Sequence, residues 1–144
     1  MKFSQQTLLE GNVIRSYAPG EITIAYPEYP DQDSSSPEEP IKARINEETL
    51  THSVIVTPDT IVKNWPPQSF DELRQSHIEQ LSEFNSEVVI LGTGQTLRFP
   101  AAKWIAVLHG RGIGFEVMDT GAACRTYNIL MSDGRKVLAA LLSD

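Results

Sequence analysis

The side chains best suited to chemistry lie close together in residues 112–128, GIGFEVMDTGAACRTYN. Asp119 offers a carboxylate that can act as a general base, Cys124 a thiol that can act as a nucleophile, and Arg125 a guanidinium that can bind an anion. A second stretch, GTG at residues 92–94, could bring a glycine backbone close to a ligand. These two stretches are the first candidates for a functional site.

Most of these residues also have a structural interpretation. The GTG at 92–94 lacks the third glycine of a dinucleotide fingerprint, and no P-loop pattern occurs, so a turn that needs positive φ explains it better than a cofactor site. Asp119 directly precedes a helical pattern, which favours a helix cap over a general base. Cys124 follows two alanines, which favours a small buried packing residue, with a reactive thiol beside Arg125 as the alternative.

No catalytic or metal-binding constellation accompanies these residues. The three histidines are scattered through the chain, and none is near Cys124 in the sequence. Their spacing matches no metal-ligand pattern. We therefore assign no catalytic residue, no metal ligand and no cofactor. Arg125 has the best functional prospects, since it must either pair with a carboxylate such as Asp119 or contact a partner.

The expected order of elements brings the two stretches together. The pattern predicts a strand at 88–91, a helix at 101–109, a strand at 114–118, a helix at 120–131 and a final buried strand at 136–142. The first two strands should be parallel, so their carboxyl ends lie at the same edge of a sheet, where α/β domains commonly bind ligands. The second helix would point its free N–H groups there, which makes a potential anion site.

The first half of the chain predicts β structure followed by a helix. Strand patterns on either side of a Pro-Gly turn indicate a β-hairpin within residues 13–26. Residues 52–57, HSVIVT, have the β-branched density of another strand. A helix is expected at 69–84, begun by an S-x-x-E capping box of Ser69 and Glu72.

Length and composition indicate a single domain spanning residues 1–144. The chain is 40% hydrophobic and 22% charged, with a net charge of −7. A net acidic chain without a basic stripe argues against nucleic acid as a partner, and no apolar run is long enough to insert into a membrane. Residues 27–40, PEYPDQDSSSPEEP, form an acidic Pro/Ser-rich surface loop, interpreted as a tolerated insertion, with an acidic docking arm as the alternative.

Cysteine content and the first residues favour a cytoplasmic location. Cys124 is the single cysteine, so no internal disulfide can form, which suits a reducing compartment. The opening residues, MKFSQQTLLEGN, lack both the apolar core of a signal peptide and the arginine-rich character of a mitochondrial presequence. We expect a cytoplasmic protein of a bacterium-like cell that is a monomer or a weak homo-oligomer.

Three segments resemble a known family: VVILGTG at 88–94, GIGFEVMDTGAACRTYNIL at 112–130 and DGRKVLAALL at 133–142. They are similar to the small uncharacterised α/β domain family that includes mitochondrial respiratory complex I assembly factor 3, together with stand-alone bacterial and archaeal members of unknown function. The resemblance implies a three-layer α/β domain with a central mixed five-stranded sheet. It implies strand order 2-1-5-3-4, with strand 5 antiparallel to the rest, plus an N-terminal β-hairpin region.

The resemblance also implies which positions form the site. The family's signature positions fall on residues 119, 120 and 124–128, with the glycines of residues 92–94 facing them. The candidate set for binding a ligand or a partner is Gly92, Thr93, Gly94, Asp119, Thr120, Cys124, Arg125, Tyr127 and Asn128.

Two functions from different classes are consistent with these features. The first is a non-catalytic protein-interaction or complex-assembly factor, which fits the lack of a catalytic constellation and the family resemblance. The second is a small-molecule-binding or cryptic enzymatic domain, with its site between residues 92–94 and 119–125. A protein partner is expected in the first case, and the sequence does not identify it.

Overall fold

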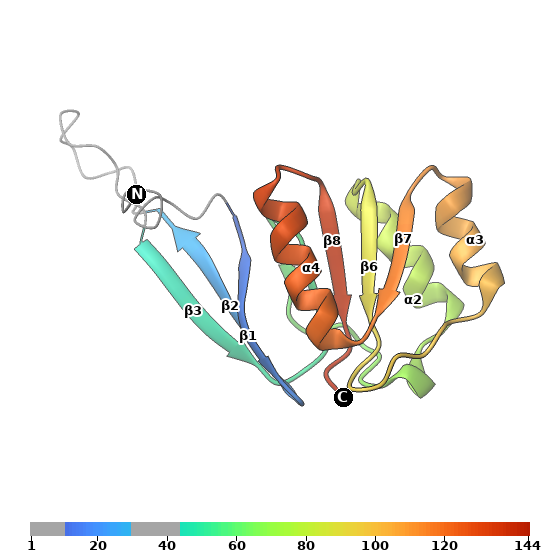
Figure 1. Cartoon of the computed structure of the whole chain (residues 1–144), viewed down its shortest axis with the longest axis horizontal. Helices are drawn as coiled ribbons and strands as arrows, with labels where there is room; N and C mark the ends of the chain where they lie inside the picture. Colours follow the sequence, from blue (N-terminus) through green and yellow to red (C-terminus); the bar gives the residue numbers. More distant parts are fainter. Residues whose placement is uncertain (1–10, 30–43) are drawn as a thin grey trace.

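A five-stranded sheet forms the centre of the protein (Figure 1). The computed structural model describes residues 11–29 and 44–144. The strands of this sheet are β4 (Val54–Val56), β5 (Ile61–Val62), β6 (Val88–Gly92), β7 (Gly114–Met118) and β8 (Val137–Leu141). β6 and β8 are buried along their whole length, as expected for apolar strands covered on both faces. The strands predicted at 88–91, 114–118 and 136–142 are therefore confirmed.

The strands lie in the order β5-β4-β8-β6-β7, which is the predicted order 2-1-5-3-4 when they are counted along the chain. The predicted orientation of strand 5 is wrong, because β8 runs parallel to β6 and the oppositely directed strand is β4. The physical reason is the connection. Helix α4 (Thr120–Ser132) carries the chain from the end of β7 back across the sheet, so β8 starts at the same edge as β7 and must run parallel to it.

Helices cover both faces of the sheet (Figure 1). α4 lies on one face, where Ile90 and Ala139 pack with Tyr127 in a shared apolar cluster. α2 (Gln75–Gln80) and α3 (Ala102–Gly110) belong to the other face, where Leu91 and Leu138 pack in a second cluster. The sheet thus separates two cores, which accounts for the full burial of its central strands.

The helix predicted at 69–84 is broken into short pieces. These are the 3-10 turns η1 (Phe70–Glu72) and η2 (Leu81–Phe84), with α2 between them. Leu73 and Arg74 are extended between η1 and α2, and the predicted capping box of Ser69 does not form. Instead His77 Nδ1 accepts a hydrogen bond from the Arg74 N–H at 2.9 Å. The break allows Leu73 to enter the core, which outweighs the helical continuity that the local pattern favours.

The N-terminal strands form a separate antiparallel sheet of β1 (Val13–Ala18), β2 (Glu21–Glu28) and β3 (Arg44–Leu50). The predicted hairpin is confirmed, and Gly20 has the positive φ of 78° that its turn requires. Ile14, Ile22 and Ile24 pack in the same cluster as α4. Of the predicted acidic loop at 27–40, the first two residues belong to β2, and residues 30–40 lie outside the described residues.

Candidate functional site

The carboxyl ends of β6 and β7 meet at the same edge of the sheet, at the bottom of Figure 1, as predicted. Gly92 is the last residue of β6 and pairs with Met118, the last residue of β7. A Cβ at Gly92 would lie 3.0 Å from both Cα and Oγ1 of Thr120 and 3.1 Å from Cδ2 of Leu141. The first residue of α4 therefore packs directly on the end of β6, and glycine is needed there for space.

Residues 92–94 and 119–120, at the carboxyl ends of β6 and β7, form what we call the corner of the domain. Thr120 connects three parts of this corner. It is fully buried. Its hydroxyl accepts a hydrogen bond from the Gly94 N–H at 2.8 Å and donates to the Leu142 carbonyl at 3.1 Å. Its own N–H donates to the Gly94 carbonyl at 2.8 Å. The residue thereby ties the loop after β6 and the end of β8 to the start of α4, and all its polar atoms have partners within the chain.

The loop at residues 92–94 also makes its hydrogen bonds and close contacts within the chain. Thr93 Oγ1 donates to the Thr96 carbonyl at 2.8 Å and accepts from the Arg98 N–H at 3.2 Å. Gly94 has a φ of 94°, and a Cβ there would lie 2.5 Å from the carbonyl oxygen of Asp144. The interpretation of this loop as a turn that needs positive φ is confirmed at Gly94. The glycine backbone approaches another part of the chain rather than an open ligand space.

Asp119 is the N-cap of α4. Its Oδ1 accepts from the Ala122 N–H at 2.9 Å, and its carbonyl accepts from the Ala123 N–H at 2.9 Å. With the Thr120 N–H bonded to Gly94, these pairings use N–H groups that would otherwise hold an anion at the helix start. The capping interpretation is confirmed, and the potential anion site has lost those donors.

Cys124 and Tyr127 lie in the core between α4 and the sheet. Cys124 is 5% exposed and Tyr127 is fully buried. Burial raises the pKa of the Cys124 thiol to about 12, against the lowering effect of the nearby Arg125 charge. The thiol therefore stays protonated at neutral pH, when it is a poor nucleophile. Burial also raises the pKa of the Tyr127 hydroxyl, which donates to the Asn12 carbonyl at 2.8 Å.

Asn128 fastens α4 to the N-terminal sheet. Its Oδ1 accepts from the Ile14 N–H at 2.9 Å, and its Nδ2 donates to the Ile14 carbonyl at 2.7 Å. The side-chain amide thus occupies backbone groups that a neighbouring strand would pair with along β1. The family resemblance placed it among the candidates for binding a ligand or a partner. The structural role went unseen because the two partners are 114 positions apart.

Arg125 is the candidate whose charged group remains available. It is exposed, and it forms no ion pair or side-chain hydrogen bond with any residue in the described ranges. The alternative pairing with Asp119 does not form, since that carboxylate caps α4. Ile129, one helical turn further on, is 61% exposed. The outer face of α4 therefore presents a guanidinium next to an apolar side chain.

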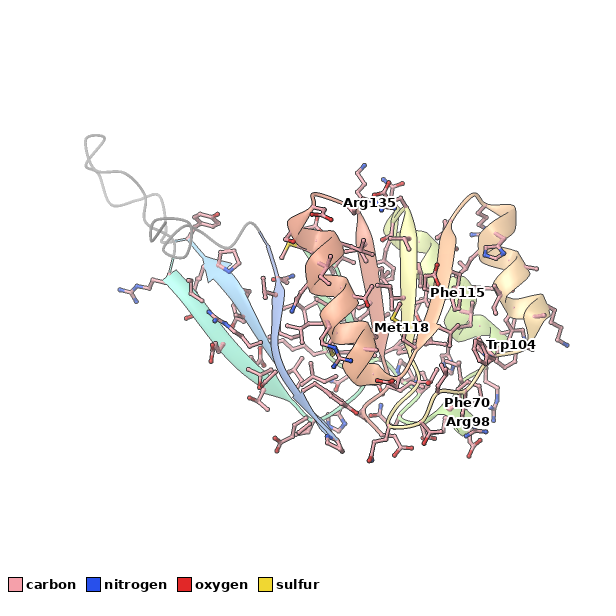
Figure 2. All side chains as sticks on the ribbon, viewed as in Figure 1. Phe70, Arg98, Trp104, Phe115, Met118 and Arg135 are labelled. Atoms are coloured by element: carbon pink, nitrogen blue, oxygen red, sulfur yellow. The ribbon has the colours of Figure 1, made fainter. Side chains whose placement is uncertain are left out.

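Two surface hollows lie away from this corner, at the opposite end of the sheet, where β6 and β8 begin. The first, of about 420 Å³, is bordered by Pro58, Asp59 and residues 134–137, where β8 begins. The second, of about 340 Å³, shares Pro58 and Asp59. Figure 2 shows Arg135 at this end and Met118 towards the other. Sequence reasoning missed both hollows, because their walls come from separate segments that carry no motif.

The described part of the chain brings the candidates together without forming a catalytic arrangement. Within it, no group of three His, Cys, Asp or Glu side chains could hold a metal ion. The corner is packed and hydrogen-bonded within the chain by Gly92, Thr93, Gly94, Asp119 and Thr120. Cys124 and Tyr127 are core residues, Asn128 is a clamp, and Arg125 is free of ion pairs among the described residues. No nucleophile is hydrogen-bonded to a base among them.

Comparison with known proteins identifies the family. A family described as "Protein of unknown function (DUF498/DUF598)" matches residues 39–142. The chain belongs to this family. The matched segment contains every strand and helix of the central sheet, from β4 to β8. The resemblance on residues 88–94, 112–130 and 133–142 is thereby confirmed.

Its relatives include one protein with an assembly role in its name. NADH dehydrogenase (ubiquinone) 1 alpha subcomplex assembly factor 3 of Danio rerio is 36% identical over 103 residues, which cover 68% of this chain and 57% of that protein. The chain thus spans about half the length of the curated relatives that it matches. A crystal structure of a Bordetella parapertussis protein is 30% identical with a TM-score of 0.72, covering 93% of this chain and 97% of the other.

A bacterial relative carries a name that refers to a membrane. The 13 kDa major membrane protein of Francisella tularensis is 27% identical over 70 residues, which cover 49% of this chain and 57% of that protein. In the present structure, no helix of the described residues is long and apolar enough to cross a membrane.

Proposed function

We propose that this chain is a non-catalytic protein-interaction factor that assists the assembly of a larger complex. The observation that carries the proposal is the contrast between Arg125 and the other candidates. The polar groups of Thr93, Asp119, Thr120 and Asn128 have partners within the chain, whereas the Arg125 guanidinium is exposed with no ion pair among the described residues. An unpaired guanidinium beside an exposed apolar side chain is typical of residues that anchor protein interfaces.

The relatives lend further support. Complex assembly is stated in the name of assembly factor 3 of Danio rerio, and the similarity to it covers most of this chain. Because the chain spans little more than half of that protein, the partner and the complex are not carried over. We propose only the shared class of activity, in which a folded module binds another protein without transforming it.

The alternative, a small-molecule-binding or enzymatic domain at residues 92–94 and 119–125, receives less support. A ligand there would have to displace the Gly94–Thr120 hydrogen bonds and the packing of Asp144 against Gly94. Cys124 is protonated at neutral pH and buried, so it does not supply a nucleophile. An increase in melting temperature with an anionic metabolite, lost on changing this corner, would favour the alternative.

A cytoplasmic location remains part of the proposal. It rests on the single cysteine and on the acidic composition, with a net charge of −7. Association with membrane complexes through a protein partner is compatible with it. Fractionation of the producing cells tests this part. Recovery of the protein in the periplasmic or secreted fraction would contradict it.

The proposal is tested by affinity purification of the tagged chain from the cells that produce it. We expect a specific protein to co-elute, and Arg125→Glu to reduce its recovery by about tenfold or more, as for an interface anchor. Arg44→Glu is the matched control, since Arg44 is exposed on β3 and has no ion pair among the described residues. Absence of any specific protein, or equal recovery with both variants, would count against the proposed role of Arg125 and its face.

A further inference from the structure

The outer edge of β7 carries backbone groups with no partner in the described chain. β7 is the last strand of the central sheet and pairs with β6 alone. The Gly114 N–H donates to Glu87 at 3.0 Å, and the Met118 carbonyl accepts from Thr93 at 2.8 Å. Backbone groups alternate in direction along a strand, so those of Phe115 and Val117 point away from β6.

The other sheet edges in the described ranges are protected in ways that proteins commonly use. β1 is held by Asn128, and its register is interrupted between Ile14 and Ser16. β3 carries Glu47 and Glu48, which form ion pairs with other side chains. β5 has two residues, too few to act as a template.

β7 has neither a side-chain clamp nor an interrupted register, and its one charged side chain forms no ion pair with the described residues. Its sequence is GFEVM, and its single charged residue is Glu116, which is exposed at the middle of the strand. Phe115 and Val117 are half-buried on either side of it. Figure 2 shows Phe115 on β7 at the side of the sheet where α3 carries Trp104. The edge is therefore apolar apart from this carboxylate, and its outward backbone groups have no hydrogen-bond partner among the described residues.

We propose that β7 binds an extended segment of a partner protein as a sixth strand of the sheet, with a basic residue opposite Glu116. This inference rests on the proposed function and adds a second contact surface to the Arg125 face of α4. The unpaired N–H and C=O groups of Phe115 and Val117 match the chemistry of another extended backbone. In an antiparallel arrangement, the residue opposite Glu116 lies in a non-hydrogen-bonded pair, where side chains are closest, so opposite charge is favoured.

Charge argues against a second copy of this chain as the occupant. The antiparallel register that pairs Phe115 and Val117 of one copy with the same residues of another sets Glu116 against Glu116. Like charges directly opposite destabilise a strand pair. The chain as a whole also has a net charge of −7, which disfavours self-association and favours a basic segment.

The test uses the full chain to select binders from a displayed library of short random peptides. We expect the selected peptides to alternate apolar residues around a central Lys or Arg. Val117→Pro removes an outward N–H that is unpaired in the free protein, so the fold should tolerate it while peptide affinity falls at least tenfold. Val117→Ala is the matched control, because it keeps the N–H while shortening the side chain. Its affinity should stay near that of the unmodified chain.

A charge reversal sharpens the test. Glu116→Lys should weaken basic-centred peptides about two- to fivefold and shift the selection towards acidic centres. Amide NMR signals of Phe115 and Val117 should shift on binding, and the melting temperature of each variant shows that it is folded.

Three results would overturn the inference. The selected peptides could bind Val117→Pro as tightly as the unmodified chain, or the library could yield no enriched peptide. The unmodified chain could also form a concentration-dependent dimer that Val117→Pro abolishes. Failure of the inference is separable from failure of the proposed function. If a cellular partner co-elutes equally with Val117→Pro, the β7 edge is not its binding surface, but the proposed interaction role still holds. Lack of any cellular partner contradicts the interaction role itself.

Discussion

The carboxyl end of β7 and its outer edge differ in how completely their polar groups are used. At the carboxyl end, Thr120 and Gly94 exchange hydrogen bonds in both directions, and Asp119 caps α4. Along the outer edge, the backbone groups of Phe115 and Val117 have no partner among the described residues. The first region holds most of the candidate site residues, and the second holds none of them.

The difference shows that a sequence signature can mark the most constrained part of a fold. Glycines, a threonine and an aspartate cluster at the corner because a helix start, a loop and a strand end must pack there without space for larger groups. A strand edge needs no particular side chain to bind another backbone. Such an edge is recognised in the structure from backbone groups that have no hydrogen-bond partner.

The largest expected effect is at Thr120. Thr120→Val keeps the shape of the side chain and leaves the Gly94 N–H and the Leu142 carbonyl without their buried partner. We expect the free energy of unfolding to fall by about 2–4 kcal/mol, measured by urea denaturation. Thr126→Val on the same helix is the control, because Thr126 forms no side-chain hydrogen bond with the described residues, and it should change stability by less than about 1 kcal/mol. Equal effects of both variants would contradict the assigned role of Thr120.

Gly92→Ala should have the next largest effect. Its Cβ would press on the Thr120 backbone at 3.0 Å, which cannot move without shifting α4. We expect a loss of about 1–3 kcal/mol in the free energy of unfolding. Gly110→Ala is the matched control, since a Cβ there meets nothing within 4 Å. If Gly92→Ala were as stable as Gly110→Ala, the corner would have space that a ligand could use.

Asn128→Ala tests the clamp between α4 and β1. Loss of two hydrogen bonds to Ile14 should cost about 1–2 kcal/mol of unfolding free energy. The Ile14 amide should also exchange with solvent much faster, as hydrogen–deuterium exchange can show. Ser132→Ala, an exposed change on the same helix, should leave that amide protected. Unchanged Ile14 protection in Asn128→Ala would mean that the sheet is held by packing alone.

The smallest effect concerns Cys124 at neutral pH. With its pKa raised from 9.0 to about 12, the folded thiol should react with iodoacetamide roughly a thousandfold more slowly than a free thiol. The raised pKa also links stability to pH. Burial of the neutral thiol contributes to the free energy of unfolding. This contribution is fully present below pH 9.0, where the unfolded thiol is still protonated, and it is lost as the pH rises towards 12. Rapid labelling of the folded protein at pH 7 would contradict this burial.

The second half of the fold was predictable because each element has an unambiguous local pattern. β6 and β8 are continuous apolar runs, and Asp119 marks the start of α4 by a capping geometry that is local in the sequence. The orientation of β8 follows from its entry through α4, and the resemblance gave it wrongly. Continuity of the helix at 69–84 failed because burial of Leu73 overrides the local preference.

The site was predictable in position and less so in role. Parallel pairing of β6 and β7 correctly brought residues 92–94 and 119–120 together. The roles of Asn128 and Tyr127 depend on Ile14 and Asn12, which lie more than a hundred positions away. Unpaired backbone along β7 has no signal in the sequence, because it depends on where the strand lies in the sheet.

Whether the corner maintains the fold while the edge of β7 binds the partner is tested most directly by comparing Thr120→Val with Val117→Pro. The measurement is recovery of the cellular partner, at a temperature where urea denaturation shows both variants to be folded. We predict full recovery with Thr120→Val despite its lower stability, and at least tenfold lower recovery with Val117→Pro at nearly unchanged stability. Loss of the partner with Thr120→Val and full recovery with Val117→Pro would contradict that assignment.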